Sequence, residues 1–142
     1  MQVHIKNSSW KVLEYKTLGA CAFDFESSED VVFAPGEWRL VETGTVIATP
    51  EGYCLVIAPR SSIFKNYGLM QVNSIGIVDQ DYSGDTDSIK FPYINMRKEE
   101  VIIKKWERIG QGMFVKIEKP EFVLVEKMAD KNRGGFGTTG IN

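Results

Sequence analysis

Apolar and polar residues alternate along much of the chain with a repeat close to two residues. Such a repeat is typical of β-strands, whose successive side chains point to opposite faces of a sheet. The alternation is clearest at residues 38–42, 113–117 and 122–126. Short turn-forming stretches separate the apolar runs, at residues 34–37, 49–52, 82–85 and 119–121. Many short strands joined by turns predict an all-β sandwich or barrel.

Little helix is predicted, because no segment repeats apolar residues at helical spacing over three turns. One short helix is expected after Arg60, where Ser61 and Ser62 could cap a segment that ends near Asn66. The last ten residues contain four glycines and too few apolar side chains to order themselves. We therefore expect one β domain over residues 1–130 and a flexible Gly-rich C-terminal tail over residues 131–142.

Composition and charge argue against several classes of function. The chain has 17 basic and 19 acidic residues, a net charge of −2 and no clustered Lys/Arg stripe, so direct nucleic-acid binding is disfavoured. It begins without an apolar signal segment and contains no apolar run of about 20 residues, so we expect a cytoplasmic protein without membrane contact. His4 is the only histidine and there are two cysteines, so neither a conventional zinc site nor a Ser-His-Asp triad is expected.

Residues 59–62, Pro-Arg-Ser-Ser, follow an apolar run and precede the predicted helix. The free N–H groups at a helix start, the Ser61 hydroxyl and the Arg60 guanidinium together suit a phosphate. An arginine and a helix cap at an ordinary turn are the alternative interpretation of this segment taken alone.

Residues 73–85 place Asp79 directly after an apolar strand, with Tyr82 three residues later. The neighbouring Ile77 and Val78 predict partial burial of the Asp79 carboxylate, which makes it the best candidate in the chain for a general base. The alternative is an acidic hairpin, and for Asp81 and the two aspartates that follow it we expect solvent-exposed charges.

Five segments, taken in order, resemble the motifs of the homotrimeric deoxyuridine triphosphatase (dUTPase) family. Residues 21–25 (Cys-Ala-Phe-Asp-Phe) are similar to A-G-x-D-L, residues 59–62 to P-R-S-G, residues 73–84 to N-x-x-G-x-I-D-x-D-Y-x-G, residues 107–111 (Glu-Arg-Ile-Gly-Gln) to G-E-R-I-A-Q, and residues 133–140 (Arg-Gly-Gly-Phe-Gly-Thr-Thr-Gly) to R-G-x-G-G-F-G-S-T-G. The resemblance runs from about Gly19 to Gly140. Chance could produce one such match, whereas five in family order make a specific signal.

The resemblance implies a fold, an assembly and a reaction. The fold would be a distorted jelly roll, or β-clip sandwich, and three chains would build three active sites that are each shared by all three subunits. The reaction would be the Mg²⁺-dependent hydrolysis of dUTP to dUMP and pyrophosphate, by attack of water on the α-phosphate. It would limit uracil in DNA and supply dUMP for dTMP synthesis.

The resemblance also assigns roles to single residues. Asp79 would activate the attacking water, and Asp24 would hold the Mg²⁺–triphosphate through a metal-bound water. Asn73 and the hairpin backbone around it would read the uracil edge, Tyr82 would lie under the deoxyribose, and Phe136 would stack on the uracil as the tail closes. The phosphates would be contacted by Arg60, Ser61, Gln111 and Arg133. The full set of implied substrate contacts is Arg60, Ser61, Ser62, Asn73, Gly76, Val78, Tyr82, Gln111, Arg133, Phe136, Gly137 and Thr138.

Two other functions on the same fold stay open at this point. A dCTP deaminase binds a similar nucleotide, but the placement of Asp79 and Tyr82 argues for the triphosphatase. A nucleotide-sensing regulatory protein would keep the pocket and signal instead of turning over substrate, and the presence of Asp79 argues against an inactive site. A second role is compatible with catalysis, in which an exposed segment over residues 91–101 binds a protein regulator.

Overall fold

Eleven strands and one short helix make up the part of the chain that the computed structural model describes, residues 1–129, 131–132 and 134–135. The strands are β1 (Ile5–Asn7), β2 (Phe23–Glu26), β3 (Val31–Phe33), β4 (Trp38–Glu42), β5 (Thr45–Ile47), β6 (Tyr53–Pro59), β7 (Leu69–Gln71), β8 (Gly76–Val78), β9 (Lys90–Asn95), β10 (Val101–Ile103) and β11 (Arg108–Lys116). The helix is α1 (Ile63–Tyr67). The predicted all-β class with one short helix is confirmed. No helix among these residues is long and apolar enough to cross a membrane.

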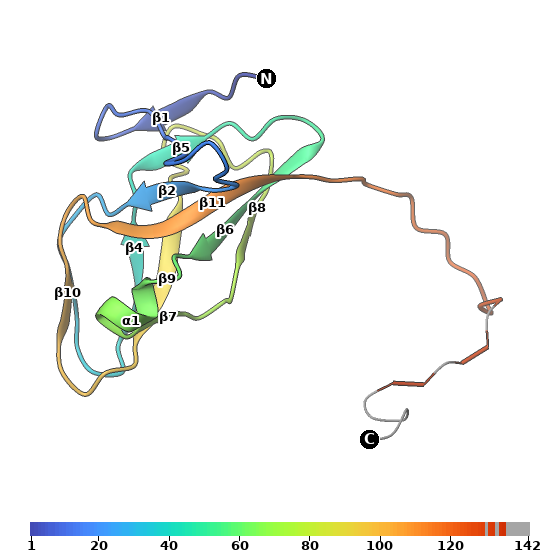
Figure 1. Cartoon of the computed structure of the whole chain (residues 1–142). Helices are drawn as coiled ribbons and strands as arrows, with labels where there is room; N and C mark the ends of the chain where they lie inside the picture. The colour runs from blue at the N-terminus through green and yellow to red at the C-terminus, as the bar shows by residue number, and fades with distance from the viewer. Residues whose placement is uncertain (130, 133, 136–142) are drawn as a thin grey trace.

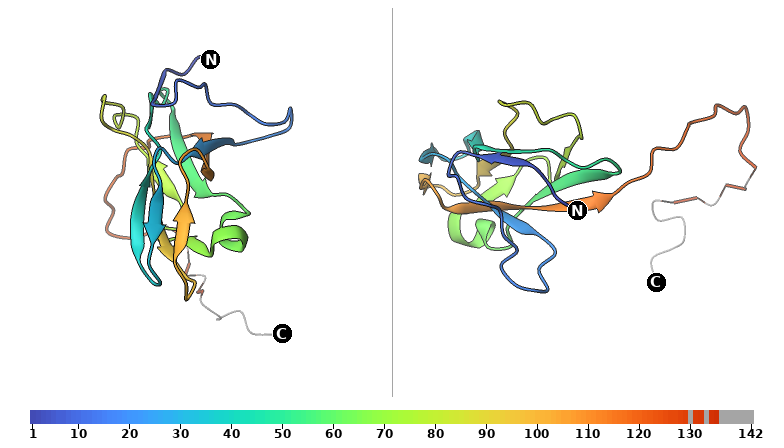
Figure 2. Two further views of the ribbon diagram at one scale, coloured as in Figure 1. Left: turned by 90° about the vertical axis from the view of Figure 1, so that its left-hand side faces the viewer. Right: turned by 90° about the horizontal axis from the view of Figure 1, so that it is seen from above.

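Two antiparallel sheets form the body of the molecule (Figure 1). The larger sheet has the strand order β2-β11-β6-β8, and the smaller has the order β4-β9-β7. Two ribbons, β1-β5 and β3-β10, complete the strand pairing. Figure 1 and the right-hand view of Figure 2 show that the chain runs away from this body after β11.

The core between the two sheets is rich in aromatic side chains. Phe25 on β2 contacts Phe91 on β9 with 5.6 Å between ring centroids, and Phe91 stacks on Tyr93 at 6.0 Å. All three side chains are fully buried. The Tyr93 hydroxyl donates a buried hydrogen bond of 2.7 Å to the Ile109 carbonyl on β11. This bond ties the smaller sheet to the larger one across the core.

A β-bulge in β11 changes which residues of this strand face the core and which face the surface. The register between β11 and β2 shifts between Arg108 and Gly110. Ile109 and Gly110 are therefore both buried, while Arg108 and Gln111 stay on the outer face of the sheet. Gly110 has to be a glycine, because a Cβ at this position would collide with the Phe91 ring.

Helix α1 follows β6 as the sequence predicts, and Ser62 is its N-cap residue. The Ser62 side chain makes no capping hydrogen bond, so the prediction of a serine cap is wrong in that detail. The helix ends at Gly68, which adopts a left-handed conformation with φ 65° and donates its N–H to the Phe64 carbonyl at 2.7 Å. Arg60 lies between the end of β6 and this helix, so both elements hold its backbone.

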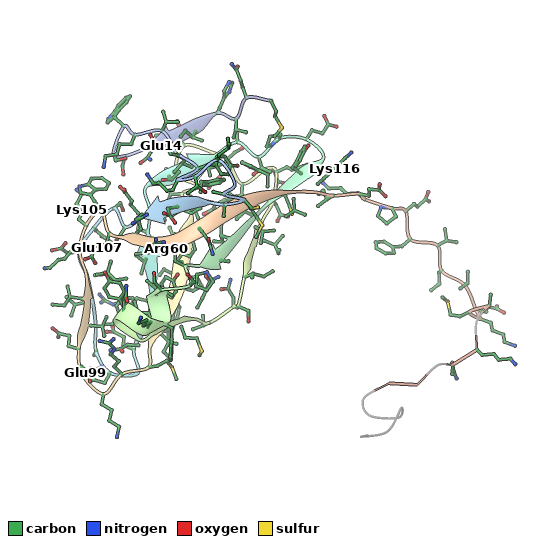
Figure 3. The ribbon with its side chains drawn as sticks, viewed as in Figure 1. Glu14, Arg60, Glu99, Lys105, Glu107 and Lys116 are labelled. Carbon is green, nitrogen blue, oxygen red and sulfur yellow. The ribbon has the colours of Figure 1, made fainter. Side chains whose placement is uncertain are left out.

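The prediction of a strand over residues 122–126 is wrong for the single chain. Phe122, Val123 and Leu124 are exposed, and no strand of the described residues pairs with this segment. Figure 3 shows Lys116 where β11 ends and the chain leaves the body. A strand needs a hydrogen-bonded neighbour for its backbone, and the described part of the chain supplies none here. The alternation therefore leaves an apolar surface without a partner.

The prediction that residues 91–101 form an exposed segment is also wrong. Strand β9 lies in the middle of the smaller sheet, between β4 and β7. Phe91 and Tyr93 face the core from it and are fully buried. The surface part of this segment is the turn over residues 96–100. Figure 3 shows Glu99, which belongs to this turn, at the lower left of the molecule.

Candidate functional site

One carboxylate held by two arginines lies on the outer face of the larger sheet. Asp24 accepts a hydrogen bond from Arg60 Nε at Oδ1 and one from Arg108 Nη1 at Oδ2, both at 3.0 Å. The Asp24 side chain is 17% exposed, whereas those of Arg60 and Arg108 are 26% and 45% exposed. Two cations around one anion leave this cluster with a net positive charge. Such a cluster suits a ligand that carries several negative charges.

Strand register brings the members of this cluster together. Asp24 alternates with two buried phenylalanines on β2, so its side chain points outward. Gln111 is its direct partner on β11, and Gln111 Nε2 donates to the Pro59 carbonyl at 3.0 Å. Arg60 follows Pro59 directly, and Figure 3 shows it beside α1. The predicted phosphate contacts Arg60 and Gln111 thus lie around Asp24.

Ser61 and Ser62 extend this cluster toward α1. Ser61 is exposed, whereas Ser62 is half-buried and its carbonyl accepts a hydrogen bond of 2.9 Å from the Asn66 N–H. Ser61 is therefore the more accessible of the two predicted serine contacts.

Two tyrosines that interact with Arg60 stay protonated at neutral pH. Burial raises the pKa of Tyr93 well above its ordinary value of 10, although the Arg60 charge acts in the opposite direction. Burial raises the pKa of Tyr67, and a hydrogen bond with Glu107 and its negative charge raise it further. Neither phenol can therefore act as a base near neutral pH.

A second feature is a cavity of about 260 Å³ beside strand β8. The predicted base and three of the predicted substrate contacts line it, namely Asp79, Gly76, Val78 and Tyr82. The other lining residues are Ile57, Ile77, Ser88, Ile89 and Lys90. The Tyr82 hydroxyl donates to the Ser88 carbonyl at 3.1 Å, which holds the ring at the cavity wall. A small cavity with apolar walls and one carboxylate suits a flat ring or a sugar.

Asn73 lies next to this cavity, at the turn between β7 and β8. Its Nδ2 is 3.8 Å from the position that a Cβ on Gly76 would take. Its Oδ1 accepts a hydrogen bond of 2.9 Å from Gln71 Nε2. The turn itself is tight, because Ser74 has a positive φ of 61° and donates its N–H to the Gln71 carbonyl at 3.3 Å. The amide nitrogen of Asn73 is thus directed to the Gly76 side.

The prediction that Asp79 is partly buried is wrong for the single chain, in which Asp79 is exposed. Strand β8 is an edge strand of the larger sheet, and Ile77 on it is exposed as well. Ile77 faces solvent and Val78 packs inward against the core, so neither neighbour buries the Asp79 carboxylate. Burial of Asp79 would need a second surface packed over this edge.

The arginine cluster and the cavity lie far apart within one chain. Val78 pairs with Leu55 on β6, five residues before Arg60, which is about 17 Å along the strand at 3.3 Å per residue. Asp24 is on β2, three strands from β8, which adds about 14 Å across the sheet at 4.8 Å per strand. The structure therefore keeps Asp79 distant from the Asp24 and Arg60 of its own chain.

The four predicted contacts of the tail, Arg133, Phe136, Gly137 and Thr138, lie outside the described residues. One residue of the cluster, Arg108, was not assigned a role from the sequence. It stands inside the segment 107–111, in which the resemblance gave a role to Gln111 alone. The signal that could have found it is its positive charge within a motif. In the structure it stands on β11, between β2, which carries Asp24, and β6, which is followed by Arg60.

Asp24 is the predicted magnesium contact, and its surroundings show which mode of Mg²⁺ binding would suit it. Among the residues that the structure describes, no group of three or more His, Cys, Asp and Glu side chains could hold a metal ion. Both Asp24 oxygens already accept hydrogen bonds from arginine. These observations fit a Mg²⁺ ion that is coordinated mainly by phosphates and reaches Asp24 through water, because Mg²⁺ keeps several waters and uses few protein carboxylates.

Comparisons with known proteins agree on one family. The family model for dUTPase matches residues 8–140. A deoxyuridine 5'-triphosphate nucleotidohydrolase of Finegoldia magna is 39% identical over 145 residues, which cover 99% of each chain. An SPbeta prophage-derived deoxyuridine 5'-triphosphate nucleotidohydrolase of Bacillus subtilis is 38% identical over 118 residues, which cover 82% of each chain.

Solved structures show the same fold. The dUTPase of Staphylococcus bacteriophage 80alpha with dUpNHpp matches with a TM-score of 0.85 at 23% identity, over 99% of each chain. The dUTPase of Streptococcus mutans matches with a TM-score of 0.73 at 25% identity, over 87% of this chain and 98% of that one. The predicted jelly-roll-like sandwich is thereby confirmed. The family match over nearly the whole sequence, with relatives close to 40% identical, leads to one conclusion: this chain belongs to the dUTPase family.

Proposed function

We propose that this protein is a dUTP diphosphatase, which hydrolyses dUTP to dUMP and pyrophosphate. Membership of the dUTPase family supports the proposal, as do the names of the relatives. The observation that carries it is the cavity beside β8, which is lined by Asp79 and Tyr82 together. A carboxylate and an aromatic ring around a small cavity suit the activation of water beside a bound nucleoside.

In this proposal Asp79 accepts a proton from the water that attacks the α-phosphate. A positioned general base contributes roughly 10²–10⁴-fold to a rate. Tyr82, held by the Ser88 carbonyl, would lie under the deoxyribose and leave no room for a 2′-hydroxyl. The Asn73 amide and the backbone at Gly76 and Val78 would contact the uracil edge.

The arginine cluster would receive the triphosphate. Arg60, Ser61, Ser62 and Gln111 would contact its oxygens, whose negative charge complements the cluster. Mg²⁺ bound to phosphate oxygens would neutralise the charge that shifts toward the leaving pyrophosphate. Asp24 would hold this ion through water, with its carboxylate oriented by the two arginines that bind it.

The C-terminal tail belongs to the proposal on the resemblance alone. Residues 131–142 would act as a flexible segment that closes over the bound nucleotide. Arg133 would reach the terminal phosphate, Phe136 would stack on the uracil, and Gly137 and Thr138 would contact the substrate beside them.

The proposal includes a homotrimer with shared active sites. Since Asp79 is distant from the arginine cluster of its own chain, a complete site needs the cavity of one chain beside the cluster of another. The unpartnered apolar residues at 122–125 provide surface for contact between chains. The exposed edge strand β8 would be covered in such an assembly, which would bury Asp79.

With this activity, the protein would limit uracil in DNA and supply dUMP for dTMP synthesis in the cytoplasm. A protein regulator remains part of the proposal without an assigned surface, because much of the segment 91–101 is interior.

Product analysis tests the proposed function. The purified protein is incubated with Mg²⁺ and, separately, dUTP, dCTP, dTTP and UTP, alongside Asp79→Asn and Asp81→Asn. Asp81 is a matched control, because it is also exposed on the same turn and does not line the cavity. We expect dUMP and pyrophosphate from dUTP alone, at a rate that falls by about 10²-fold or more in Asp79→Asn and is retained in Asp81→Asn.

Two outcomes would contradict the proposal in different ways. Ammonia and dUTP formed from dCTP would establish a deaminase. Saturable dUTP binding without turnover would establish a nucleotide-sensing regulatory protein.

A further inference from the structure

Gln71 is a buried glutamine whose side-chain amide faces Asn73. It ends strand β7, is 5% exposed and pairs with Tyr93 on β9. Its Nε2 donates to Asn73 Oδ1 at 2.9 Å, whereas its own Oε1 is buried and has no hydrogen-bond partner among the described residues. A buried acceptor without a partner disfavours folding. A glutamine at this position therefore needs an explanation outside the stability of the core.

The contact with Gln71 decides which way the Asn73 amide points. A primary amide carries an acceptor oxygen and a donor NH₂ group on opposite sides of one carbon. With Oδ1 bound to Gln71, the Asn73 Nδ2 is turned to Gly76, which lines the cavity. The backbone is held too, because the Ser74 N–H donates to the Gln71 carbonyl at 3.3 Å and the Ile75 N–H donates to the Asn73 carbonyl at 2.6 Å. Asn73 therefore presents donors on the cavity side.

We propose that Gln71 is a specificity-determining positioning residue, which holds the Asn73 NH₂ group toward the nucleobase and so favours a uracil carbonyl over a cytosine amino group. This inference rests on the proposed function, in which a uracil nucleotide occupies the cavity. Uracil carries a carbonyl acceptor at C4, where cytosine carries an amino donor. The Asn73 NH₂ group can donate to the uracil carbonyl, whereas in cytosine it meets a second donor, the amino group. A site built on one hydrogen-bond pattern can reject the unmatched analogue by about 10⁴–10⁵.

Two substitutions of Gln71 separate this role from a structural one. Gln71→Leu keeps the size of the side chain and releases the Asn73 amide, so the amide can rotate. Gln71→Glu replaces the donor with a second acceptor, so the Asn73 NH₂ group should turn toward residue 71 and its oxygen toward the base. The control is Leu69→Val, which disturbs the packing of a fully buried residue on the same strand and leaves the amide pair in place.

The readouts, in the presence of Mg²⁺, are kcat and KM for hydrolysis of dUTP and, at a high concentration of enzyme, for the residual hydrolysis of dCTP. For Gln71→Leu we expect KM for dUTP to rise about 10-fold while kcat changes less than about 3-fold. For Gln71→Glu we expect the ratio of kcat/KM for dUTP to that for dCTP to fall by about 10²-fold. Leu69→Val should lower Tm and leave this ratio unchanged.

An unchanged ratio in both Gln71 variants would overturn the inference. An equal loss of kcat for the two nucleotides would also overturn it, because that is the result of a structural role. If Gln71→Glu does not fold, Gln71→Leu and Gln71→Met decide by the same KM and ratio. Absence of dUTP hydrolysis by the wild type would overturn the proposed function instead. The ratio of calorimetric Kd values for dUTP and dCTP then tests the inference on its own, and an unchanged ratio in the variants overturns it.

Discussion

Gly76 on β8 pairs directly with Ile57 on β6, and no space for a side chain is left between them. A Cβ at Gly76 would lie 2.5 Å from Ile57 Cγ1 and 2.9 Å from its Cδ1, whereas carbon atoms pack at about 3.5–4.0 Å. Gly76→Ala therefore requires that β8 or the Ile57 side chain move by about 1 Å. Gly76 is not among the residues with positive φ, so the cost is steric.

The size of the effect follows from the burial of Ile57, which is 4% exposed and cannot swing into solvent. Overpacking a core costs about 1–3 kcal/mol, so we expect Gly76→Ala to lower the free energy of unfolding by about 2 kcal/mol. Ile57→Ala should cost about 2–5 kcal/mol by itself, but it makes room for the new methyl group. The double variant should therefore lose about 1–2 kcal/mol less free energy of unfolding than the sum of the two single losses.

Urea denaturation of the wild type, the two single variants and the double variant measures this coupling, provided that the m value does not change. The same displacement moves Val78 and Asp79 at the cavity, so kcat/KM for dUTP should fall by about 10²-fold in Gly76→Ala. A Gly76→Ala protein within about 0.5 kcal/mol of wild-type stability would refute the reasoning. Strictly additive losses in the double variant would refute it too.

Three further predictions concern residues near the arginine cluster and the cavity. Tyr93→Phe leaves the buried Ile109 carbonyl without its donor, so the free energy of unfolding in urea should fall by about 1–3 kcal/mol. Arg108→Met should change stability by less than about 1 kcal/mol, because Arg108 is 45% exposed. In steady-state assays the KM for dUTP should nevertheless rise about 10-fold, because the arginine cluster, which is proposed to receive the triphosphate, loses one of its two cations. The pKa of Glu42 lies below its ordinary value of 4.5, because burial, which acts to raise it, is outweighed by hydrogen bonds from the Ser88 hydroxyl and a backbone N–H and by a nearby lysine. The ionised Glu42 therefore stabilises the fold above pH 4.5, and this contribution is lost as the pH falls through the lower folded-state pKa. The Tm difference between wild type and Glu42→Gln should accordingly shrink in acid, and a difference that stays constant with pH would contradict this account.

Features that depend on local alternation could be predicted from the sequence. Asp24 stands between two phenylalanines on a short strand, so its outward direction follows from the period of two. The short helix after Arg60 was also predicted, from two serines that could cap it, although the Ser62 side chain makes no capping hydrogen bond. The resemblance assigned Gln111 and Arg60 to the phosphates, and in the structure the register of β11 with β2 places Gln111 opposite Asp24.

Features that depend on distant neighbours could not be predicted in this way. Residues 91–101 contain charged and polar side chains, yet Phe91 is interior because its face of the smaller sheet packs on the larger sheet, where Phe25 contacts it. Residues 122–126 alternate like a strand, but alternation does not supply the second strand that the backbone needs. The position of Arg108 depends on a bulge, which shifts the register by one residue and has no signature in the hydrophobic pattern.

The separation of Asp79 from Arg60 along β6 has a consequence for mixed populations of the protein. A chain with a disabled base keeps an intact arginine cluster, and a chain with a disabled cluster keeps an intact base. In the proposed assembly neither variant would be active alone. When their subunits exchange, some sites would receive an intact base from one chain and an intact cluster from another, and activity would return. Two defective alleles in one cell would thus complement each other. Dilution that separates the subunits would abolish the activity even of the wild-type protein.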